Sequence, residues 1–519
     1  MSDHGLLLFA LLLGVPLAGA LLAGTLRGRA GDWVAVMAAL ATAGVAGVLV
    51  LQHGTRGVTL PLGGLPVLDR VAGHPVPLFG FALDPLASVV LLGAVILGFV
   101  CVVYSVAYVG PGNREIPASD DRRGYWFWML MFVMAMAGLV TSATLVQMFV
   151  FWEITTVCSW ALIGFYDREE GAQAAAQKAF LMTAGGGLAL FATVLTLLAL
   201  THSAGFDAIS ALPPAARGAT LLLWLLMLAG AWAKSGQVPF HTWLPSAMVA
   251  PSPVSAYLHA ASMVNAGVYL ALRMALSNAT PAPLAAAGAA GAGWLPAVAA
   301  LPAALPVVVG VMAVVTMVVA VAQFFYQDDL KRLLALSTIS QLALVMLGVA
   351  LAMAGSARAA QGAALHILAH GVGKALLFLS VGSLSYAAGT RHIRDLAGVR
   401  ERAPVAAMGF LIGALTVTGV PPFAGFWSKL LIVTGAVSLG GVGVWAGALV
   451  VLESLVAFAW FLWVGQRVFL GRPSPAAATM TVAAPAMEAA LVILMVLSVA
   501  ITAVALPLAS AVRPGGFGG

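Results

Sequence analysis

Long apolar stretches, each of helical length, follow one another along the chain and are separated by short polar connections. A helix needs roughly 20 apolar residues to cross the hydrocarbon core of a bilayer, so the pattern predicts about fourteen transmembrane helices. Runs of this length differ from the alternating segments of about ten residues that build a membrane β-barrel. The predicted helices are 5–26, 33–52, 83–109, 126–142, 145–166, 176–200, 217–235, 252–275, 304–325, 333–354, 361–386, 404–435, 443–466 and 486–508.

The composition agrees with an all-α integral membrane fold. Of the 519 residues, 62% are hydrophobic and only 8% are charged, whereas soluble domains carry about 25% charged residues. The formal net charge of +6 does not indicate nucleic-acid binding, because the basic residues lie in short connections between spans, where they set topology. The lipid bilayer is therefore an expected partner, and nucleic acid is not.

The basic residues also predict the orientation. When the connections are assigned alternately to two sides, most of the 24 lysines and arginines fall on one side. Cytoplasmic connections are enriched in basic residues, so this side is predicted to be the cytoplasm and both termini to lie outside it. The outer side then holds only Arg56, Arg70, Arg217, Arg273, Arg358 and Arg513.

Two Pro- and Gly-rich breaks beside lysines suggest an internal duplication. They are AKSGQVPFHTWLP at 233–245 and GVPPFAGFWSK at 419–429. Interrupted helices in corresponding places of two halves are typical of inverted-repeat transporters, with the ion site near the breaks. We therefore expect two inverted five-helix units with broken helices, the first at 126–275 and the second at 304–437. Helices 1–3 precede them in segment 1–125, and helices 13–14 follow them in segment 438–519.

Three ionisable residues lie four residues apart in the apolar stretch 361–378, namely His366, His370 and Lys374. On an α-helix they fall within about 80° of arc and span about 12 Å along the axis. One ionisable side chain at the bilayer centre costs roughly 2.5–3.5 kcal/mol on insertion scales, so three on one stripe need an explanation. A file of proton-exchanging groups inside the membrane is what a proton path requires. The alternative is that hydrogen bonds to other helices satisfy the stripe.

Other ionisable residues in apolar surroundings are candidates for the same path. Glu153 needs a cation or a proton, and Lys234, beside the first break, is the expected partner. Such a pair is either an electrostatic switch or a static tie between helices. His259 could carry protons or could only form a hydrogen bond to another helix. Lys429 could belong to the path, or its side chain could snorkel to a nearby membrane–water interface.

Three residues are possible accessories. Lys178 could be a relay or an anchor, and Asn265 is a polar neighbour of His259 that cannot titrate. Glu453 could be a proton exit partner or could contact another subunit.

Two further polar features are interpreted as structural. Asp84 precedes Pro85 and is expected to cap a helix N-terminus. The segment 327–332, QDDLKR, is expected to be a solvated connection into the next helix.

The sequence shows no soluble active site and no cofactor pattern. Cys101 and Cys158 lie in apolar segments without metal-ligand spacing, so no cluster and no disulfide is expected in this chain. His366 and His370 could in principle bind a metal, but no third ligand lies beside them in the sequence.

Five segments between residues 75 and 470 resemble the antiporter-like membrane subunits shared by respiratory complex I, multisubunit Na⁺/H⁺ antiporters and energy-converting hydrogenases. The likeness is closest to the D subunit of hydrogenase-4-type complexes, through VCSWALI and ESLVAFAWF. The five segments are FWEITTVCSWALIGFY, AWAKSGQVPFHTWLPSAMVAPSPVSAYLHAASMV, QDDLKRLLALSTISQLA, HILAHGVGKALLFLSVGSLSY and TGVPPFAGFWSK.

The resemblance implies roles for the ionisable residues. Glu153 and Lys234 match the ion pair on the family's fifth and seventh helices, and His259 matches a histidine on the eighth helix. The central relay is matched by His366, His370 and Lys374. Lys429 matches the lysine on the twelfth helix. Many relatives have a lysine where this chain has Asn265, so a proton step there would depend on His259 or water.

The resemblance also implies the setting. We expect a proton-translocating subunit, without a redox centre of its own, in a bacterial cytoplasmic membrane. Its partners would be other membrane subunits and a peripheral redox arm that carries Ni-Fe and Fe–S centres. One alternative is a Na⁺/H⁺ antiporter subunit, and a second is a structural subunit that no longer conducts.

Overall fold

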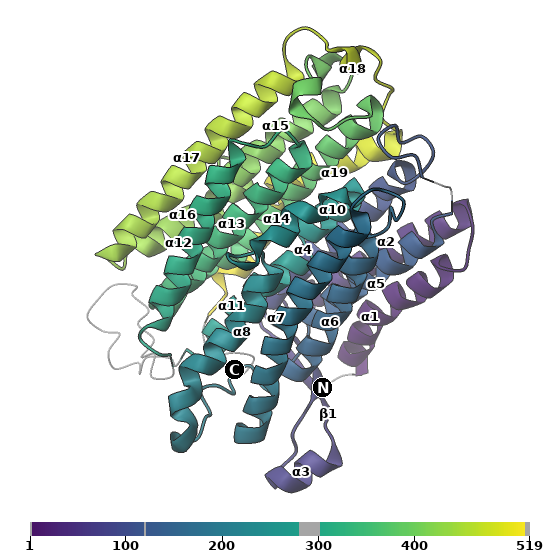
Figure 1. Cartoon of the computed structure of the whole chain (residues 1–519). Helices are drawn as coiled ribbons and strands as arrows, with labels where there is room; N and C mark the ends of the chain where they lie inside the picture. Colours follow the sequence, from purple (N-terminus) through teal and green to yellow (C-terminus); the bar gives the residue numbers. More distant parts are fainter. Residues whose placement is uncertain (1–2, 119–120, 280–300, 514–519) are drawn as a thin grey trace.

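The structure, a computed structural model, describes residues 3–118, 121–279 and 301–513 as a bundle of long helices (Figure 1). Twelve helices in this part of the chain are long and apolar enough to cross a membrane. The long and broken helices are α1 (Asp3–Ala23), α2 (Arg29–His53), α4 (Pro85–Tyr108), α5 (Arg123–Val140), α6 (Leu145–Ile163), α7 (Ala172–Thr201), α8 (Thr220–Lys234), α10 (Ser252–Ala260), α11 (Met263–Ser277), α12 (Leu305–Phe324), α13 (Leu330–Met353), α14 (Ala357–Ala388), α15 (Pro404–Thr418), α16 (Ala424–Val437), α17 (Val442–Phe469) and α19 (Pro485–Ser510).

The all-α membrane fold predicted from the sequence is confirmed, but two predicted spans are broken. The span expected at 252–275 is divided into α10 and α11, and the span expected at 404–435 is divided into α15 and α16. The total of fourteen spans and the inverted units stay predictions.

The two Pro- and Gly-rich breaks lie where they were predicted. At the first break, helix α8 ends at Lys234 and helix α10 begins at Ser252. The segment between them contains only short helical turns, including α9 (Trp243–Ser246). Gly236 and Gly419, which follow the ends of α8 and α15, have φ values of +61° and +87°. Only glycine adopts this left-handed region without steric cost, so both residues let the chain turn out of a helix.

The segment 53–82, which lies between the predicted helices 33–52 and 83–109, is partly regular. Its strands β1 (Val58–Gly63) and β2 (Phe79–Leu83) pair antiparallel around α3 (Pro66–Ala72). This hairpin projects from one end of the bundle, and α18 (Pro475–Ala478) lies at the opposite end (Figure 1). The segment 276–303, between the predicted helices 252–275 and 304–325, falls mostly outside the described residues.

The helix that carries the predicted stripe, α14, lies at the centre of the bundle (Figure 1). It packs against α4, α10, α13, α15, α16 and α19. The most apolar windows of α13 and α14 are entirely buried inside the chain, whereas only 33% of the residues in those of α1, α12 and α17 are buried. Polar groups on α13 and α14 are therefore shielded from lipid by other helices of this chain.

The predicted cap of α4 is confirmed, because Asp84 accepts a hydrogen bond from the backbone N–H of Ala87 at 2.8 Å. Asp84 also forms an ion pair that the sequence did not suggest, with Nη1 of Arg273 at 2.5 Å and Nη2 at 2.7 Å. The side chain of Arg273 is only 1% exposed. Arg273 is therefore a buried residue of α11, within the span predicted at 252–275.

The segment 327–332 is less solvated than expected. Asp329 caps α13 by accepting from the backbone N–H groups of Lys331 and Arg332, and it also binds Arg391. Lys331 is buried and donates to the carbonyl oxygen of Ala250 at 2.5 Å. This lysine joins the start of α13 to the start of α10.

Candidate functional site

His366, His370 and Lys374 lie buried on α14, as the stripe pattern predicted. The imidazole rings of the two histidines stack, with centroids 6.3 Å apart and planes inclined by 27°. Lys374 Nζ donates to the carbonyl oxygen of Leu334 on α13 at 3.1 Å. It also lies 5.7 Å from the ring centroid of Phe461 on α17. Three ionisable groups thus occupy the core of the bundle.

The two histidines of α14 differ in their partners. His366 Nδ1 lies 2.8 Å from Ser428 Oγ on α16, and its Nε2 lies 3.1 Å from Gln341 Oε1 on α13. Neither ring nitrogen of His370 has a hydrogen-bond partner in the described part of the chain. Buried polar atoms without a protein partner are sites where internal water bridges, so His370 is suited to exchange protons with water.

His259 on α10 faces the same central helix. Its ring lies 4.9 Å from the ring of Phe378 on α14, between centroids. The residue is fully buried, and neither ring nitrogen bonds any group in the described ranges. Asn265 lies beyond the break between α10 and α11, where its Nδ2 donates to the carbonyl oxygen of Ala260 at 2.7 Å. Asn265 therefore satisfies a backbone carbonyl at that break.

A buried ion pair stands next to the stripe. Lys429 Nζ on α16 lies 3.3 Å from Glu453 Oε2 on α17 and 2.7 Å from Ser454 Oγ. The other carboxylate oxygen, Oε1, accepts from Ser340 Oγ at 2.8 Å and from Gln341 Nε2 at 2.6 Å. The carboxylate of Glu453 is thus enclosed within this chain and does not face a neighbouring subunit.

Glu153 and Lys234, the expected ion pair, are not in direct contact, although the two charges interact over a longer distance. Lys234 Nζ donates to the backbone oxygen of Trp152 at 2.5 Å and to Thr155 Oγ1, and it lies 4.4 Å from the centroid of the Trp152 ring. The half-buried Glu153 faces α7 instead, where a Cβ added to Gly187 would lie 2.1 Å from its Oε1. Successive residues of a helix point about 100° apart, so the lysine binds a different face of α6 from the one that carries Glu153.

Lys178 lies apart from the buried chain of groups. Its half-buried side chain on α7 donates to Ser246 Oγ at 3.2 Å, in the segment between α8 and α10. This contact favours the anchor interpretation over the relay interpretation.

A cavity of about 360 Å³ reaches Lys429 from the side. Its wall includes the break residues Thr418, Gly419 and Val420 and, on α17, Ser454. A cavity of this volume is large enough for water, and two hydroxyl groups and an ammonium group line it. Space for water therefore opens beside Lys429.

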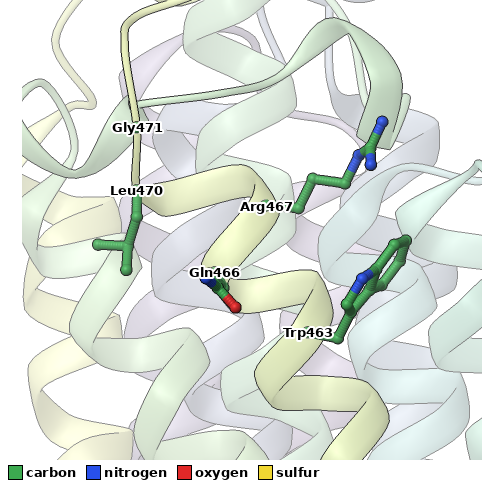
Figure 2. A pocket seen from close by; sticks show the side chains of 5 residues that line it. All are labelled: Trp463, Gln466, Arg467, Leu470 and Gly471. Carbon is green, nitrogen blue, oxygen red and sulfur yellow. The ribbon is translucent and has the colours of Figure 1, made fainter.

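A second pocket lies at the end of α17, away from the buried groups. It measures about 350 Å³ and is lined by Trp463, Gln466, Arg467, Leu470 and Gly471. Figure 2 shows the side chains of Trp463, Gln466 and Arg467 projecting from the last turns of the helix. The Arg467 guanidinium carbon lies 5.5 Å from the Trp463 ring centroid. An arginine and a tryptophan at the end of a long apolar helix are typical of a membrane–water interface.

Sequence reasoning missed Gln341, which contacts both His366 of the stripe and Glu453 of the ion pair, and Ser340, which also bonds Glu453. The only signal was the polar run STISQ at 337–341 inside an otherwise apolar helix. Periodicity marks such residues as buried on α13, but it does not say which side chains they meet. Within the described ranges, no group of three or more His, Cys, Asp or Glu residues could hold a metal ion.

Comparison with known proteins places this geometry in a family context. NADH-quinone oxidoreductase subunit L of Mycobacterium tuberculosis (strain ATCC 25618 / H37Rv) is 36% identical over 452 residues, which cover 83% of this chain and 64% of the relative. Chloroplastic NAD(P)H-quinone oxidoreductase subunit 5 of Lemna minor is 34% identical over 371 residues, covering 68% of this chain and 45% of the relative. The chain thus spans less than two thirds of the length of these relatives.

Two solved structures share the fold. A chain of the Mrp complex from Dietzia sp. DQ12-45-1b matches with a TM-score of 0.78 and 28% identity, over 99% of this chain and 53% of that chain. A chain of the membrane-bound sulfane sulfur reductase, an archaeal respiratory membrane complex, matches with a TM-score of 0.76 over 94% of this chain and 75% of that chain. At 23% identity the second match shows a likeness of fold alone.

The family is shown by a sequence model described as "NADH:quinone oxidoreductase/Mrp antiporter, TM", which matches residues 142–457. This range covers more than half of the chain and includes every buried ionisable residue from Glu153 to Glu453. The chain therefore belongs to the NADH:quinone oxidoreductase/Mrp antiporter transmembrane family.

Proposed function

We propose that this chain is a proton-translocating subunit of a redox-driven membrane complex and carries protons through buried Glu, Lys and His residues. The observation that carries the proposal is the set of such groups on α6, α8, α10, α14, α16 and α17. The proposed order is Glu153, Lys234, His259, the pair His366 and His370, Lys374 and Lys429, with Glu453 on α17 as a possible accessory. Ionisable residues at membrane depth are costly and mark ion pathways, so a set that crosses the bundle supports transport.

The setting is part of the same proposal. The relatives named as quinone oxidoreductase subunits, and the fold shared with an archaeal respiratory complex, support partners in the form of other membrane subunits and a peripheral redox arm. The Ni-Fe and Fe–S centres of a hydrogenase-4-type complex would lie in those partners. The complex would lie in a bacterial cytoplasmic membrane, with both termini of this chain on the outer side and two inverted units at 126–275 and 304–437.

A second candidate is a subunit of a Na⁺/H⁺ antiporter. The match to a chain of the Mrp complex, which covers 99% of this chain, favours it. The two functions differ in what drives transport, because an antiporter exchanges ion gradients without electron transfer.

Reconstitution of the intact complex separates these functions. The complex would be purified, its subunits identified by mass spectrometry, and proton uptake into proteoliposomes measured during its redox reaction. We expect acidification of the lumen that an uncoupler abolishes and that persists when K⁺ replaces Na⁺. A proton flux that needs a Na⁺ gradient and no redox reaction would establish the antiporter instead. Full redox activity without any proton uptake would leave only the structural role.

The carboxylate of Glu153 provides a test within the first half of the path. We expect Glu153→Gln to lower proton uptake by roughly tenfold or more, since a group that exchanges protons is replaced by one that cannot. Gly187→Ala should produce a smaller decrease, because its Cβ would displace the carboxyl group that lies against it. Uptake per redox turnover is the measurement.

The same helix offers a matched control for Gly187→Ala. A Cβ at Gly185 would meet no atom within 4 Å, so Gly185→Ala has the same change in helix propensity without the contact to Glu153. Equal uptake in the two alanine variants would contradict a role for the position of the Glu153 carboxyl group.

A further inference from the structure

The hydrogen bonds around Gln341 determine the orientation of its amide. An ionised carboxylate only accepts hydrogen bonds, so the group of Gln341 that lies 2.6 Å from Glu453 Oε1 is the amide NH₂. The carbonyl oxygen of Gln341 then faces His366 Nε2 at 3.1 Å. Because that oxygen only accepts, Nε2 of His366 carries a hydrogen. The nitrogen of His366 that can gain and lose a proton is therefore Nδ1.

Ser428 allows either charge state at this nitrogen. Its hydroxyl group lies 2.8 Å from His366 Nδ1 and 2.9 Å from the carbonyl oxygen of Gly425. When His366 is neutral, the hydroxyl donates to Nδ1. When Nδ1 is protonated, it donates to Ser428 Oγ and the hydroxyl donates to Gly425. In both states every buried donor of this group has an acceptor. This removes a large part of the free-energy cost of charging a buried histidine.

The carboxylate of Glu453 connects this histidine to Lys429. One oxygen binds Gln341 and Ser340 on α13, and the other binds Lys429 on α16. Lys374 is the remaining charged group nearby, but its ammonium is directed to Leu334 and Phe461. Direct contacts thus connect four side chains in the order His366, Gln341, Glu453 and Lys429. In the first half of the path, by contrast, Lys234 bonds no carboxylate among the described residues.

We propose that Glu453 is the switching carboxylate of the second half of the path and that Gln341 is a positioning residue which transmits the charge of His366 to it. This inference rests on the proposed proton transport and assigns the partner of Lys429 within it. It also makes α17 part of the functional second half, beyond the unit expected at 304–437.

The proton step conserves the charge of the group. In the starting state His366 is neutral, Glu453 carries −1 and Lys429 carries +1. A proton that arrives at Nδ1 of His366 forms an imidazolium ion, which polarises Gln341 and weakens the hold of Glu453 on Lys429. Lys429 then releases one proton from Nζ to water in the cavity lined by Thr418 and Ser454. One proton enters and one leaves, so the sum of the three charges is zero before and after, which limits the cost in a medium of low dielectric constant.

Proton uptake by the reconstituted complex tests the assignment. We expect Glu453→Gln to lower uptake per redox turnover by roughly tenfold or more. Gln341→Met, which keeps the length of the side chain and both charged neighbours, should lower it severalfold. The double variant Gln341→Glu with Glu453→Gln moves the carboxylate to α13, within reach of the same partners, and should recover part of the uptake. Glu488→Gln in the first turn of α19 is the control and should match the unsubstituted complex.

The outcomes distinguish the inference from the proposed function. If the unsubstituted complex takes up protons and both single variants do so equally well, the role of Glu453 and Gln341 is refuted while the proposed function stands. If the unsubstituted complex takes up none, the proposed function itself fails.

A spectroscopic measurement does not depend on transport. Solid-state NMR of the complex with ¹⁵N-labelled histidine in this chain should show His366 with hydrogen on Nε2, its signal identified among the 9 histidines by its loss in His366→Ala. Gln341→Met should change this signal and leave that of the exposed His74 unaltered. A neutral His366 with hydrogen on Nδ1 would overturn the assignment.

Discussion

Replacing Lys234 by methionine is expected to abolish proton translocation while the complex still assembles and keeps its redox activity. Methionine preserves the length of the side chain in a fully buried site and removes the ammonium group that binds Trp152 O and Thr155 Oγ1. It also removes the cation that stabilises Glu153, so protons can no longer be passed through alternate charging of the two groups. The expected decrease in uptake per redox turnover is roughly tenfold or more, measured in proteoliposomes.

A basic residue at the other end of the same segment is the control. Arg217 is exposed in the turn that precedes α8, so Arg217→Ala removes a positive charge without touching the buried site. Its uptake should equal that of the unsubstituted complex. Uptake by the Lys234→Met complex at the same level as the Arg217→Ala complex would show that Lys234 is only a structural tie between α6 and α8.

The position of Lys234 shows what sequence reasoning can and cannot supply. The break after it, the apolar surroundings of Glu153 and the stripe on α14 all follow from composition and helical periodicity, and these features appear in the structure. The direct partner of Lys234 did not follow. Glu153 and Thr155 are two residues apart on one helix, and only the packing of α8 against α6 decides which of them the ammonium meets.

Long-range partners were the least predictable part of the site. Glu453 lies more than 100 residues after Gln341, and its hydrogen bond to that side chain depends on how α17 packs against α13. An isolated glutamate in an apolar helix signals that a partner exists without naming it. For this reason the sequence left two interpretations of Glu453 open, and Gln341, which does not titrate, was not considered at all.

Burial also changed the interpretation of one charge. In the sequence, Arg273 lies near the end of the predicted span 252–275 and is counted as a basic residue of the outer side. In the structure it is the buried partner of Asp84, so it no longer counts as a basic residue of the outer side. The predicted orientation then depends on the basic residues of the connections alone.

The ion pair between Asp84 and Arg273 gives the largest expected effect on stability. Asp84→Ala removes both the cap of α4 and the carboxylate that neutralises a guanidinium group with only 1% of its side chain exposed. Breaking a buried ion pair by removing one partner costs about 3–5 kcal/mol, because the remaining charge is left without compensation. Loss of the cap alone costs about 0.5–2 kcal/mol. We expect Asp84→Ala to lower the free energy of unfolding by an amount in the larger range, measured by denaturant titration of the purified protein in detergent.

Three variants separate the causes of this loss. Asp84→Asn keeps an oxygen that can accept from Ala87 but removes the charge, so most of the loss should remain if neutralisation of Arg273 is responsible. The double variant Asp84→Ala with Arg273→Leu also removes the guanidinium charge and should be more stable than Asp84→Ala alone, because an apolar side chain in place of a buried ion is often tolerated. Asp69→Ala is the matched control, since Asp69 accepts one backbone hydrogen bond in the projecting hairpin and faces no buried cation. If Asp84→Ala is no less stable than Asp69→Ala, the pair does not hold α4 and α11 together.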